Sequence, residues 1–217
     1  MTTFDNFRFS KVINIVSKHN IFLRTNIQWL DLGCNNGDFP KILIGLGCYV
    51  TGIDMDPLGP QEMNTQSWEY FKYNIAEGAF PLRSSSFDVV SGLEIIEHID
   101  DTDKFIDEVY RVLKPGGYFV LSTPNICMLR NRLRMLFGLY PHAMEYRNTR
   151  LHHIRLYNLK FLISQLKEHN FRLLLAEGMH LLPQKWLRYG WVIKLSDFLA
   201  MIFPGLCSNL VVLVKRE

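Results

Sequence analysis

Residues 29–40, WLDLGCNNGDFP, place a short apolar run directly before a glycine-containing turn and the start of a helical pattern. This strand, turn and helix order is typical of parallel sheets, where the backbone N–H groups at the helix start face a crevice. Glycines in such a turn let a ligand approach the main chain closely. The segment therefore predicts an α/β fold with a ligand site at the carboxyl end of this strand.

The rest of the chain alternates between apolar runs of strand length and amphipathic helical patterns. The predicted strands cover residues 26–32, 49–54, 68–74, 87–93, 117–123, 171–177 and 208–216. The predicted helices lie near residues 38–46, 59–66, 101–113 and 158–168. The third helix should end at LKPGG, where proline and glycine allow a tight reversal into the next strand. We expect a doubly wound, mostly parallel sheet of seven strands.

The length of the chain suits one domain, residues 1–217. Within it we expect an N-terminal helical cap over 1–26, an insertion or lid over the active site at 125–157, and an apolar insertion at 183–205. The N-terminus lacks the apolar stretch of a secretory signal, which predicts a cytoplasmic location. Four scattered cysteines without a CxxC pair indicate reduced thiols. A net charge of +3 argues against DNA and weakly against RNA as a partner.

Two carboxylates indicate the kind of ligand. Asp54 ends the second predicted strand at a distance from Gly33 that is usual for a residue that accepts both hydroxyls of a ribose. Asp31 would repel a pyrophosphate but attract the ammonium of an aminoacyl group. A dinucleotide site would also need glycines at Asn35 and Asp38. The residues therefore favour S-adenosylmethionine over a dinucleotide.

Five segments follow one another between Ile27 and Pro124: LDLGCNNG, GIDMD, YNIAEG, FDVVSGLEIIEHIDD and EVYRVLKPGGYFVLSTPN. With them the chain resembles the class I S-adenosylmethionine-dependent methyltransferases. A further segment, HHIRLYNLKFLISQLKEHNF, is similar to the subgroup of ubiquinone-pathway and small-molecule O-methyltransferases. The resemblance implies the Rossmann-like methyltransferase fold with an antiparallel last strand, S-adenosylmethionine as cofactor and S-adenosylhomocysteine as product.

The resemblance also implies a set of cofactor contacts. Its members are Asp31, Gly33, Asn35 and Gly37 around the methionine part, Asp54 at the ribose, Met55, Asn74 and Ile75 at the adenine, and Leu93. Asn35 replaces a glycine of the family, and Asn74 replaces an aspartate. Asparagine tolerates positive φ better than other non-glycine residues, so the loop should keep its shape. The side-chain oxygen of Asn74 can still accept a hydrogen bond from the adenine amine.

The segment LEIIEHID follows the fourth predicted strand, where the methyl group would point. Glu94, Glu97 and His98 allow three interpretations. Together with the distant His153 they could hold a divalent cation, as a similar group does in small-RNA 2'-O-methyltransferases, although a metal is not favoured. His98 could instead act as a general base. In the third interpretation, Glu97 and His98 only satisfy backbone groups. We take His98, Glu94 and His153 as the candidate catalytic residues; His152 beside His153 is an alternative base.

The predicted insertions carry arginines, leucines and aromatic residues, which favours an acceptor of medium size that is partly hydrophobic. We expect O-methylation of a small-molecule, lipid-linked or peptide acceptor, with peripheral membrane contact through residues 128–137 or 186–203. One alternative is a metal-dependent RNA 2'-O-methyltransferase. Another is a cofactor-binding partner protein without turnover.

Overall fold

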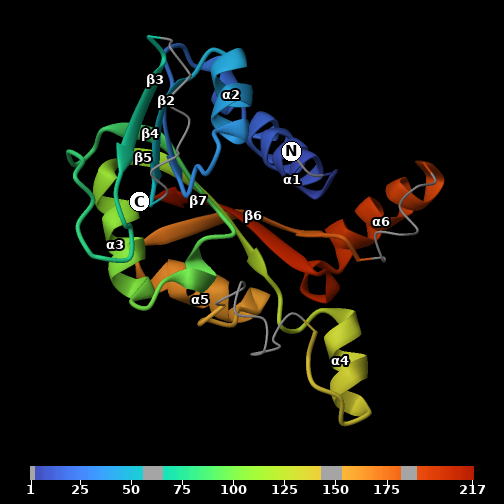
Figure 1. Cartoon of the computed structure of the whole chain (residues 1–217). Helices are drawn as coiled ribbons and strands as arrows, with labels where there is room; N and C mark the ends of the chain where they lie inside the picture. The colour runs from blue at the N-terminus through green and yellow to red at the C-terminus, as the bar shows by residue number, and fades with distance from the viewer. Residues whose placement is uncertain (1–2, 56–65, 143–152, 182–189) are drawn as a thin grey trace.

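A computed structural model describes residues 3–55, 66–142, 153–181 and 190–217. Its seven strands form one sheet in the order β3-β2-β1-β4-β5-β7-β6 (Figure 1). The strands are β1 Gln28–Leu32, β2 Tyr49–Asp54, β3 Trp68–Lys72, β4 Phe87–Leu93, β5 Leu113–Pro124, β6 Phe171–Met179 and β7 Asn209–Arg216. Strand β1 pairs in parallel with β2 and β4, whereas β7 is antiparallel to β5 and β6. The predicted sheet is confirmed.

Helices cover both faces of this sheet. They are α1 Thr3–Lys18, α2 Asp38–Gly45, α3 Thr102–Val112, α4 Leu129–Leu136, α5 Leu159–Glu168 and α6 Gly190–Ile202, with short turns η1 Ile21–Leu23, η2 Ile96–His98 and η4 Pro204–Leu206. Helices α1 and α2 lie on one face, and α3 and α5 lie on the other (Figure 1). The predictions near 38–46, 101–113 and 158–168 are confirmed, while that near 59–66 lies outside the described residues except at its end.

Successive strand residues enter two separate cores, because side chains alternate between the faces of a sheet. Trp29 packs with Phe9 of α1 and Phe39 of α2, whereas Leu30 packs in the core that contains α3 and α5. Stacking of the Phe9 and Phe39 rings, with centroids 4.9 Å apart, joins the first two helices. Helix α1 is therefore held where its first turns reach the carboxyl ends of the parallel strands.

The junction between α3 and β5 differs from the prediction in one respect. The helix ends at Val112, as expected before LKPGG, but the strand begins at Leu113 and not at residue 117. Leu113 pairs with Phe87, and the next pair joins Tyr118 to Val89, so the residues between them form an irregularity inside the strand. The reversal predicted from the glycines is therefore a bulge in β5, where Gly116 has φ 74°.

Helices α4 and α6 extend from one end of the body (Figure 1). The side-chain amide of Asn125, after β5, donates to the carbonyl oxygens of Gly205 and Cys207, which follow α6. These bonds join the start of the α4 segment to the end of the α6 segment. Within the described residues, no helix combines the length and the apolar character needed to cross a membrane.

Candidate functional site

A cavity of about 520 Å³ opens at the carboxyl ends of β1, β2 and β4. It is lined from α1, from the loop after β1, from the end of β2 and from the turn after β4. In that order, the lining residues are Asp5, Arg8 and Phe9; Asp31, Gly33, Cys34, Asn35, Asn36, Asp38 and Phe39; Asp54; and Leu93, Glu94, Ile95 and His98. A volume in this range accommodates a small ligand. The cavity lies at the carboxyl end of β1, where the strand, turn and helix pattern predicted a ligand site.

The loop after β1 has the conformation that close approach of a ligand requires. Gly33 and Gly37 have φ 73° and 76°, and Asn35 between them has φ 45°. Asparagine takes this left-handed conformation at less cost than most residues, as the sequence predicted for this position. A Cβ atom on Gly33 would lie 3.0 Å from Ile95 Cδ1, so this glycine also allows the loop to pack against the turn after β4.

Asp31 is a buried carboxylate at the end of β1, only 3% exposed. The Ser91 hydroxyl donates to its Oδ1 at 2.6 Å, and the Trp29 indole N–H donates in turn to Ser91 Oγ at 2.8 Å. Burial raises the pKa of Asp31 to about 7, although the Ser91 hydrogen bond and the charge of Arg8 oppose the rise. A buried carboxyl of this kind favours a cationic ligand, because a cation would stabilise its ionised form.

Helix α1 brings a cation to the same cavity. The Arg8 side chain, 13% exposed, forms an ion pair with Asp5 at 2.8 Å. Its positive charge lowers the pKa values of Asp31, Glu94 and Glu97 against the larger effect of burial. The sequence did not indicate Arg8, because an arginine on an amphipathic helix has no local signal for the loop it will face.

The predicted ribose ligand, Asp54, lies on the cavity wall and accepts a hydrogen bond from the Asn35 backbone N–H at 2.7 Å. The residues predicted to contact adenine are not among the described residues that line the cavity. Met55 is 65% exposed, and Ile75 is buried in the core. The Asn74 side chain donates to Glu77 at 3.0 Å and accepts from the Ala76 N–H at 3.1 Å.

The structure thus divides the predicted cofactor set into two groups. Asp31, Gly33, Asn35, Asp54 and Leu93 line the cavity together. Gly37, Met55, Asn74 and Ile75 are not part of its lining as far as the described residues define it. Segment 56–65, which follows Met55, lies outside the described residues.

Glu94 occupies a strained position at the end of β4. It has φ 58°, which is uncommon for a residue with a side chain and is often found at functional sites. Its carboxylate accepts from Ser122 Oγ and from Asn209 Nδ2, each at 2.8 Å. Burial raises the pKa of Glu94, although both hydrogen bonds oppose the rise. These contacts direct the carboxylate toward the end of β5 and the start of β7.

Glu97, His98 and His153 form a second polar group beside the cavity, with one ligand atom from each residue within 4.8 Å of the others. The rings of His98 and His153 lie 5.0 Å apart between centroids. The Glu97 carbonyl accepts from the backbone N–H groups of Ile154 and Arg155, which brings the distant segment onto η2. His98 also lines the cavity, so it links the two sites.

This group has the donors that a divalent cation requires. Glu97 is 1% exposed, and Thr123 donates to its Oε2 at 3.1 Å. Glu97 Oε1 and His153 Nδ1 are buried and have no hydrogen-bond partner among the residues that the structure describes. Two imidazoles and one carboxylate suit Zn²⁺ or Fe²⁺ better than Mg²⁺. The fourth ligand considered from the sequence, Glu94, is not in this group; its carboxylate is bonded to Ser122 and Asn209.

The pKa values of Glu97 and His153 in this group are shifted in opposite directions. Burial, together with the charge of Glu94, raises the pKa of Glu97 to about 8. Burial and the neighbouring His98 lower the pKa of His153. A neutral His153 is suited to accept a proton or to bind a metal. His152, the alternative base, lies outside the described residues.

Comparison with known proteins identifies the family. Residues 4–176 match the family model described as a methyltransferase domain. A ubiquinone biosynthesis O-methyltransferase from Colwellia psychrerythraea is 30% identical over 189 residues, which cover 80% of this chain and 71% of that protein. A probable S-adenosylmethionine-dependent methyltransferase from Mycolicibacterium smegmatis is 34% identical over 99 residues, 44% of this chain.

The extent of these matches varies. The chain spans 37% of the Mycolicibacterium protein and 44% of the ubiquinone biosynthesis O-methyltransferase from Psychrobacter arcticus, less than half of each. A structure of a putative methyltransferase from Bacillus halodurans covers 96% of this chain and 98% of its own, with a TM-score of 0.67 at 17% identity, which supports the fold. The family model and the Colwellia protein both cover most of the chain. The chain therefore belongs to the methyltransferase-domain family, as a class I S-adenosylmethionine-dependent methyltransferase.

Proposed function

We propose that the chain binds S-adenosylmethionine in the 520 Å³ cavity and transfers its methyl group to an oxygen of an acceptor. One observation carries this proposal: the lining of the cavity includes both a buried carboxylate, Asp31, and the guanidinium of Arg8, whose side chain is 13% exposed. The aminoacyl end of the cofactor carries an ammonium and a carboxylate. Asp31 would accept from the ammonium, and Arg8 would donate to the carboxylate.

The remaining cofactor contacts follow from the cavity wall. Asp54, oriented by the Asn35 N–H, would accept from the ribose hydroxyls. Met55 follows it with an exposed apolar side chain that could cover one face of the adenine. Asn74 and Ile75 stay candidates for the adenine edge, and Leu93 would contact the cofactor at the end of β4. Each of these roles is a proposal.

In the proposed reaction, the acceptor oxygen forms a bond to the methyl carbon as the bond from carbon to sulfur breaks. S-adenosylhomocysteine leaves, and the acceptor hydroxyl loses its proton to a base. His98 is the candidate base, because it lines the cavity and lies at the end of β4. His153 and Glu97 would orient its ring, and Glu94 would line the acceptor side. Alignment of the oxygen, methyl and sulfur supplies most of the rate.

A metal-dependent form of this function has a specific observation in its favour, the buried and unsatisfied Glu97 Oε1 and His153 Nδ1 of the described structure. Glu97, His98 and His153 would hold the cation. A bound cation would favour the ionised form of an acceptor hydroxyl. The RNA 2'-O-methyltransferase considered from the sequence would fall in this class. Loss of turnover on chelation, with recovery on addition of Zn²⁺ or Fe²⁺, would support this form.

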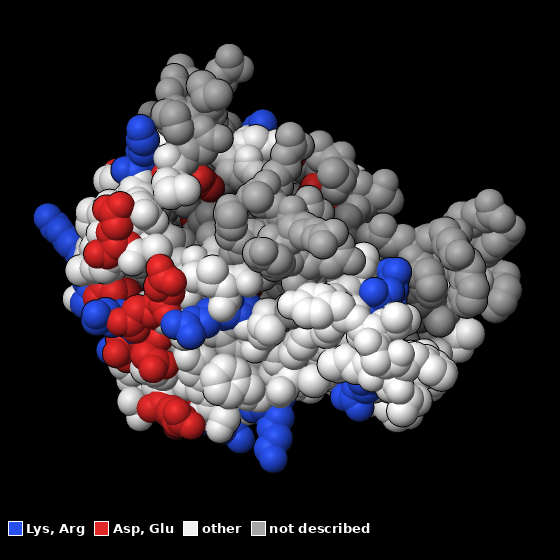
Figure 2. All heavy atoms as spheres, turned by 60° about the horizontal axis from the view of Figure 1, so that its bottom comes forward, with Lys and Arg blue, Asp and Glu red and all other residues white. Residues whose placement is uncertain are grey.

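The acceptor is proposed to be a small, partly hydrophobic molecule that reaches the site near α4. Leu133 and Leu136 of this helix and Phe137 after it are 51%, 75% and 76% exposed, and the helix also carries arginines and no acid. In Figure 2 the acidic side chains gather on the side of α3, while the described residues on the side of α4 are uncharged or basic. Such a surface is suited to a lipid-linked acceptor or to contact with an anionic membrane surface.

The other predictions about organisation are part of the proposal. The segment 1–26 would cap the cofactor, since α1 lines the cavity. Segment 125–157 would cover the acceptor, and segment 183–205 would form an apolar wall; residues 143–152 and 182–189 lie outside the described structure. The cytoplasmic location remains a prediction from the N-terminal residues.

Calorimetric titration with S-adenosylmethionine and S-adenosylhomocysteine tests the proposed function, followed by turnover with phenolic, lipid-linked and peptide acceptors. We expect binding at one site and release of S-adenosylhomocysteine with at least one hydroxyl acceptor. Binding without turnover, with or without added metal, would favour the cofactor-binding partner protein. Absence of cofactor binding by the folded chain would refute the proposal.

A further inference from the structure

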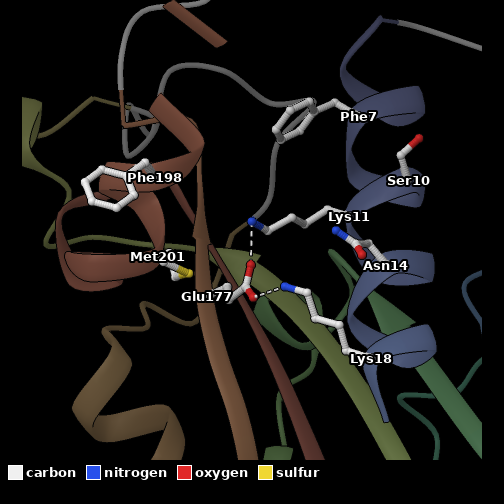
Figure 3. Close-up of a pocket in the computed structure, with 8 residues that line it drawn as sticks. All are labelled: Phe7, Ser10, Lys11, Asn14, Lys18, Glu177, Phe198 and Met201. Atoms are coloured by element: carbon white, nitrogen blue, oxygen red, sulfur yellow. Dashed lines mark hydrogen bonds and ion pairs between the residues drawn. The ribbon is translucent and has the colours of Figure 1, made fainter. Parts of the chain in front are cut away.

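A second cavity, of about 340 Å³, lies between α1, β6 and α6 (Figure 3). Lys11 and Lys18 extend from α1 toward Glu177 of β6, and Met201 of α6 points toward the same carboxylate. Phe7 and Phe198 add aromatic rings to the lining. This lining combines two cations, one anion and several apolar side chains.

The charges in this cavity do not cancel. Glu177 Oε2 lies 2.5 Å from Lys11 Nζ, and Glu177 Oε1 lies 3.1 Å from Lys18 Nζ. Burial would raise the pKa of Glu177, but the two lysines outweigh burial and hold the pKa below its usual value. The carboxylate is therefore ionised at neutral pH, and two ammonium groups face one negative charge. The cavity carries an excess of one positive charge.

A structural ion pair alone does not require this arrangement. One lysine would neutralise Glu177, and Lys18, whose side chain is 49% exposed, approaches the same carboxylate without a second anion. The Lys11 and Glu177 side chains are only 11% and 5% exposed. An ammonium has three N–H donors, and in the described structure each lysine directs one of them to Glu177. The remaining donors can bind one further anion.

The apolar part of the lining defines the rest of the ligand. Phe198 and Met201 are 56% and 53% exposed, so they offer apolar surface to a ligand in this cavity. Glu177 lies two residues before the end of β6, and this end lies at the same edge as the end of β5, because both strands are antiparallel to β7. Helix α1 contributes Arg8 to the cofactor cavity and Lys11 to this one. The two cavities thus share a wall.

We propose that the cavity between α1, β6 and α6 binds an anionic group carried on an apolar chain, with Lys11 and Lys18 as its anion-binding residues. Only the identification of this anion as part of the methyl acceptor rests on the proposed function. The shared chemistry is a single carboxylate or phosphate on a hydrocarbon chain. The acceptor would then be an amphipathic acid whose hydroxyl reaches His98 while its anion lies against α1.

The test titrates the full chain with octanoate, octyl phosphate and octanol below their micellar concentrations. We expect both anions to bind at least tenfold more tightly than octanol, because bonds between charged groups are stronger than neutral ones. Each additional buried methylene should tighten binding by up to about fourfold. The anion that binds more tightly, octanoate or octyl phosphate, identifies the anionic group of the ligand as a carboxylate or a phosphate.

Charge substitutions separate binding from structure. Lys18→Met should weaken anion binding about tenfold, whereas Lys160→Met, at an exposed position of α5, should not change it. Glu177→Gln should tighten anion binding, because it removes the competing negative charge. If the two lysines served only the ion pairs with Glu177, the unmodified chain would bind the anions no more tightly than octanol. If that variant does not fold, Lys18→Met decides, since Lys18 is 49% exposed and its loss affects stability little.

Equal binding of octanol and the anions, or no effect of Lys18→Met, would overturn the proposal. For the acceptor, Lys18→Met should lower kcat/KM about tenfold for an acid and leave it unchanged for the corresponding neutral amide. An equal loss for both acceptors would show that the anion is not part of the acceptor. Titration with S-adenosylmethionine is a separate measurement on the other cavity. Absence of cofactor binding would refute the proposed function, whereas binding of the anions tests only the cavity between α1, β6 and α6.

Discussion

Replacement of Asp31 by asparagine should increase stability while weakening cofactor binding. Asp31 is 3% exposed, and its burial raises the pKa from 3.8 to about 7. Such a rise means that the ionised carboxyl destabilises the cofactor-free fold by on the order of 4 kcal/mol. Asparagine removes the charge and keeps an oxygen for the Ser91 hydroxyl. We expect Asp31→Asn to raise the free energy of unfolding at pH 8 by up to about 4 kcal/mol.

The dependence on pH follows from the sign of this pKa change. The unfolded carboxyl loses its proton near pH 4, whereas folded Asp31 keeps its proton up to about pH 7. The contribution of Asp31 to stability therefore falls as the pH rises from 4 to 7. The stability difference between Asp31→Asn and the unmodified chain should be absent below pH 4 and complete above pH 7.

Cofactor binding should respond in the opposite direction. Only the ionised Asp31 attracts the ammonium, so affinity for S-adenosylmethionine should fall about tenfold per pH unit below pH 7. Asp31→Asn should weaken binding by about 10- to 100-fold at pH 7, since it removes one charge-assisted hydrogen bond. The affinity of the variant should lack this pH dependence.

Urea denaturation and calorimetric titration measure the two effects on the same samples. Asp100→Asn is a matched control, because Asp100 is exposed after η2. It should change neither stability at pH 8 nor cofactor affinity by a measurable amount. An Asp31→Asn variant that is less stable at pH 8 and binds the cofactor as tightly as the unmodified chain would refute the role of buried Asp31.

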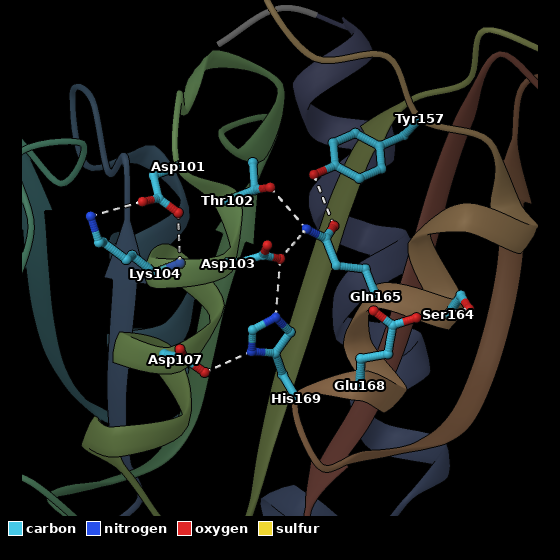
Figure 4. Close-up of polar contacts among 10 residues, drawn as sticks. All are labelled: Asp101, Thr102, Asp103, Lys104, Asp107, Tyr157, Ser164, Gln165, Glu168 and His169. Carbon is cyan, nitrogen blue, oxygen red and sulfur yellow. Dashed lines mark hydrogen bonds and ion pairs between the residues drawn. The ribbon is translucent and has the colours of Figure 1, made fainter.

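Three further variants test other parts of the site and fold. Arg8→Met should weaken S-adenosylmethionine about tenfold or more by calorimetry, while Arg83→Met, at an exposed loop position, should not. His98→Ala should lower kcat by about 10²- to 10⁴-fold, because His98 is the candidate base; unchanged turnover would exclude this role. His169 contacts Asp103 and Asp107 across α3 and α5 (Figure 4), and although burial opposes the change, these contacts raise its pKa. His169 should contribute about 1 kcal/mol or less to the free energy of unfolding, because both aspartates are 67% exposed. This contribution should be present at pH 5.5 and lost as the pH rises through the raised pKa of His169. His169→Gln should remove this pH dependence in urea denaturation.

Most of the fold was predictable because local patterns coincide with the elements. The bounds of β2 and β4 agree with the apolar runs 49–54 and 87–93. The carboxyl ends of parallel strands meet at one edge, so the sequence alone was enough to place Asp31 and Asp54 around one cavity. The early start of β5 at Leu113 was missed, because glycines and proline do not show whether a turn or a bulge forms.

The parts of the site that were missed depend on contacts between distant segments. Arg8 reaches the cavity only because α1 packs through Phe9 against α2, which no local spacing indicates. The separation of Glu94 from Glu97 depends on Ser122 and Asn209, which belong to other strands. Whether His153 would reach His98 was open from the sequence; backbone hydrogen bonds to the Glu97 carbonyl bring the two rings together.

A crystal structure of the complex with S-adenosylhomocysteine would show where and how the cofactor binds. We expect the ligand in the 520 Å³ cavity, with its ammonium within hydrogen-bond distance of Asp31 and its carboxylate bound by Arg8. We also expect the ribose hydroxyls at Asp54 and the sulfur directed toward the end of β4, near His98. A ligand bound elsewhere, or with its aminoacyl group away from both Asp31 and Arg8, would contradict the proposed binding mode.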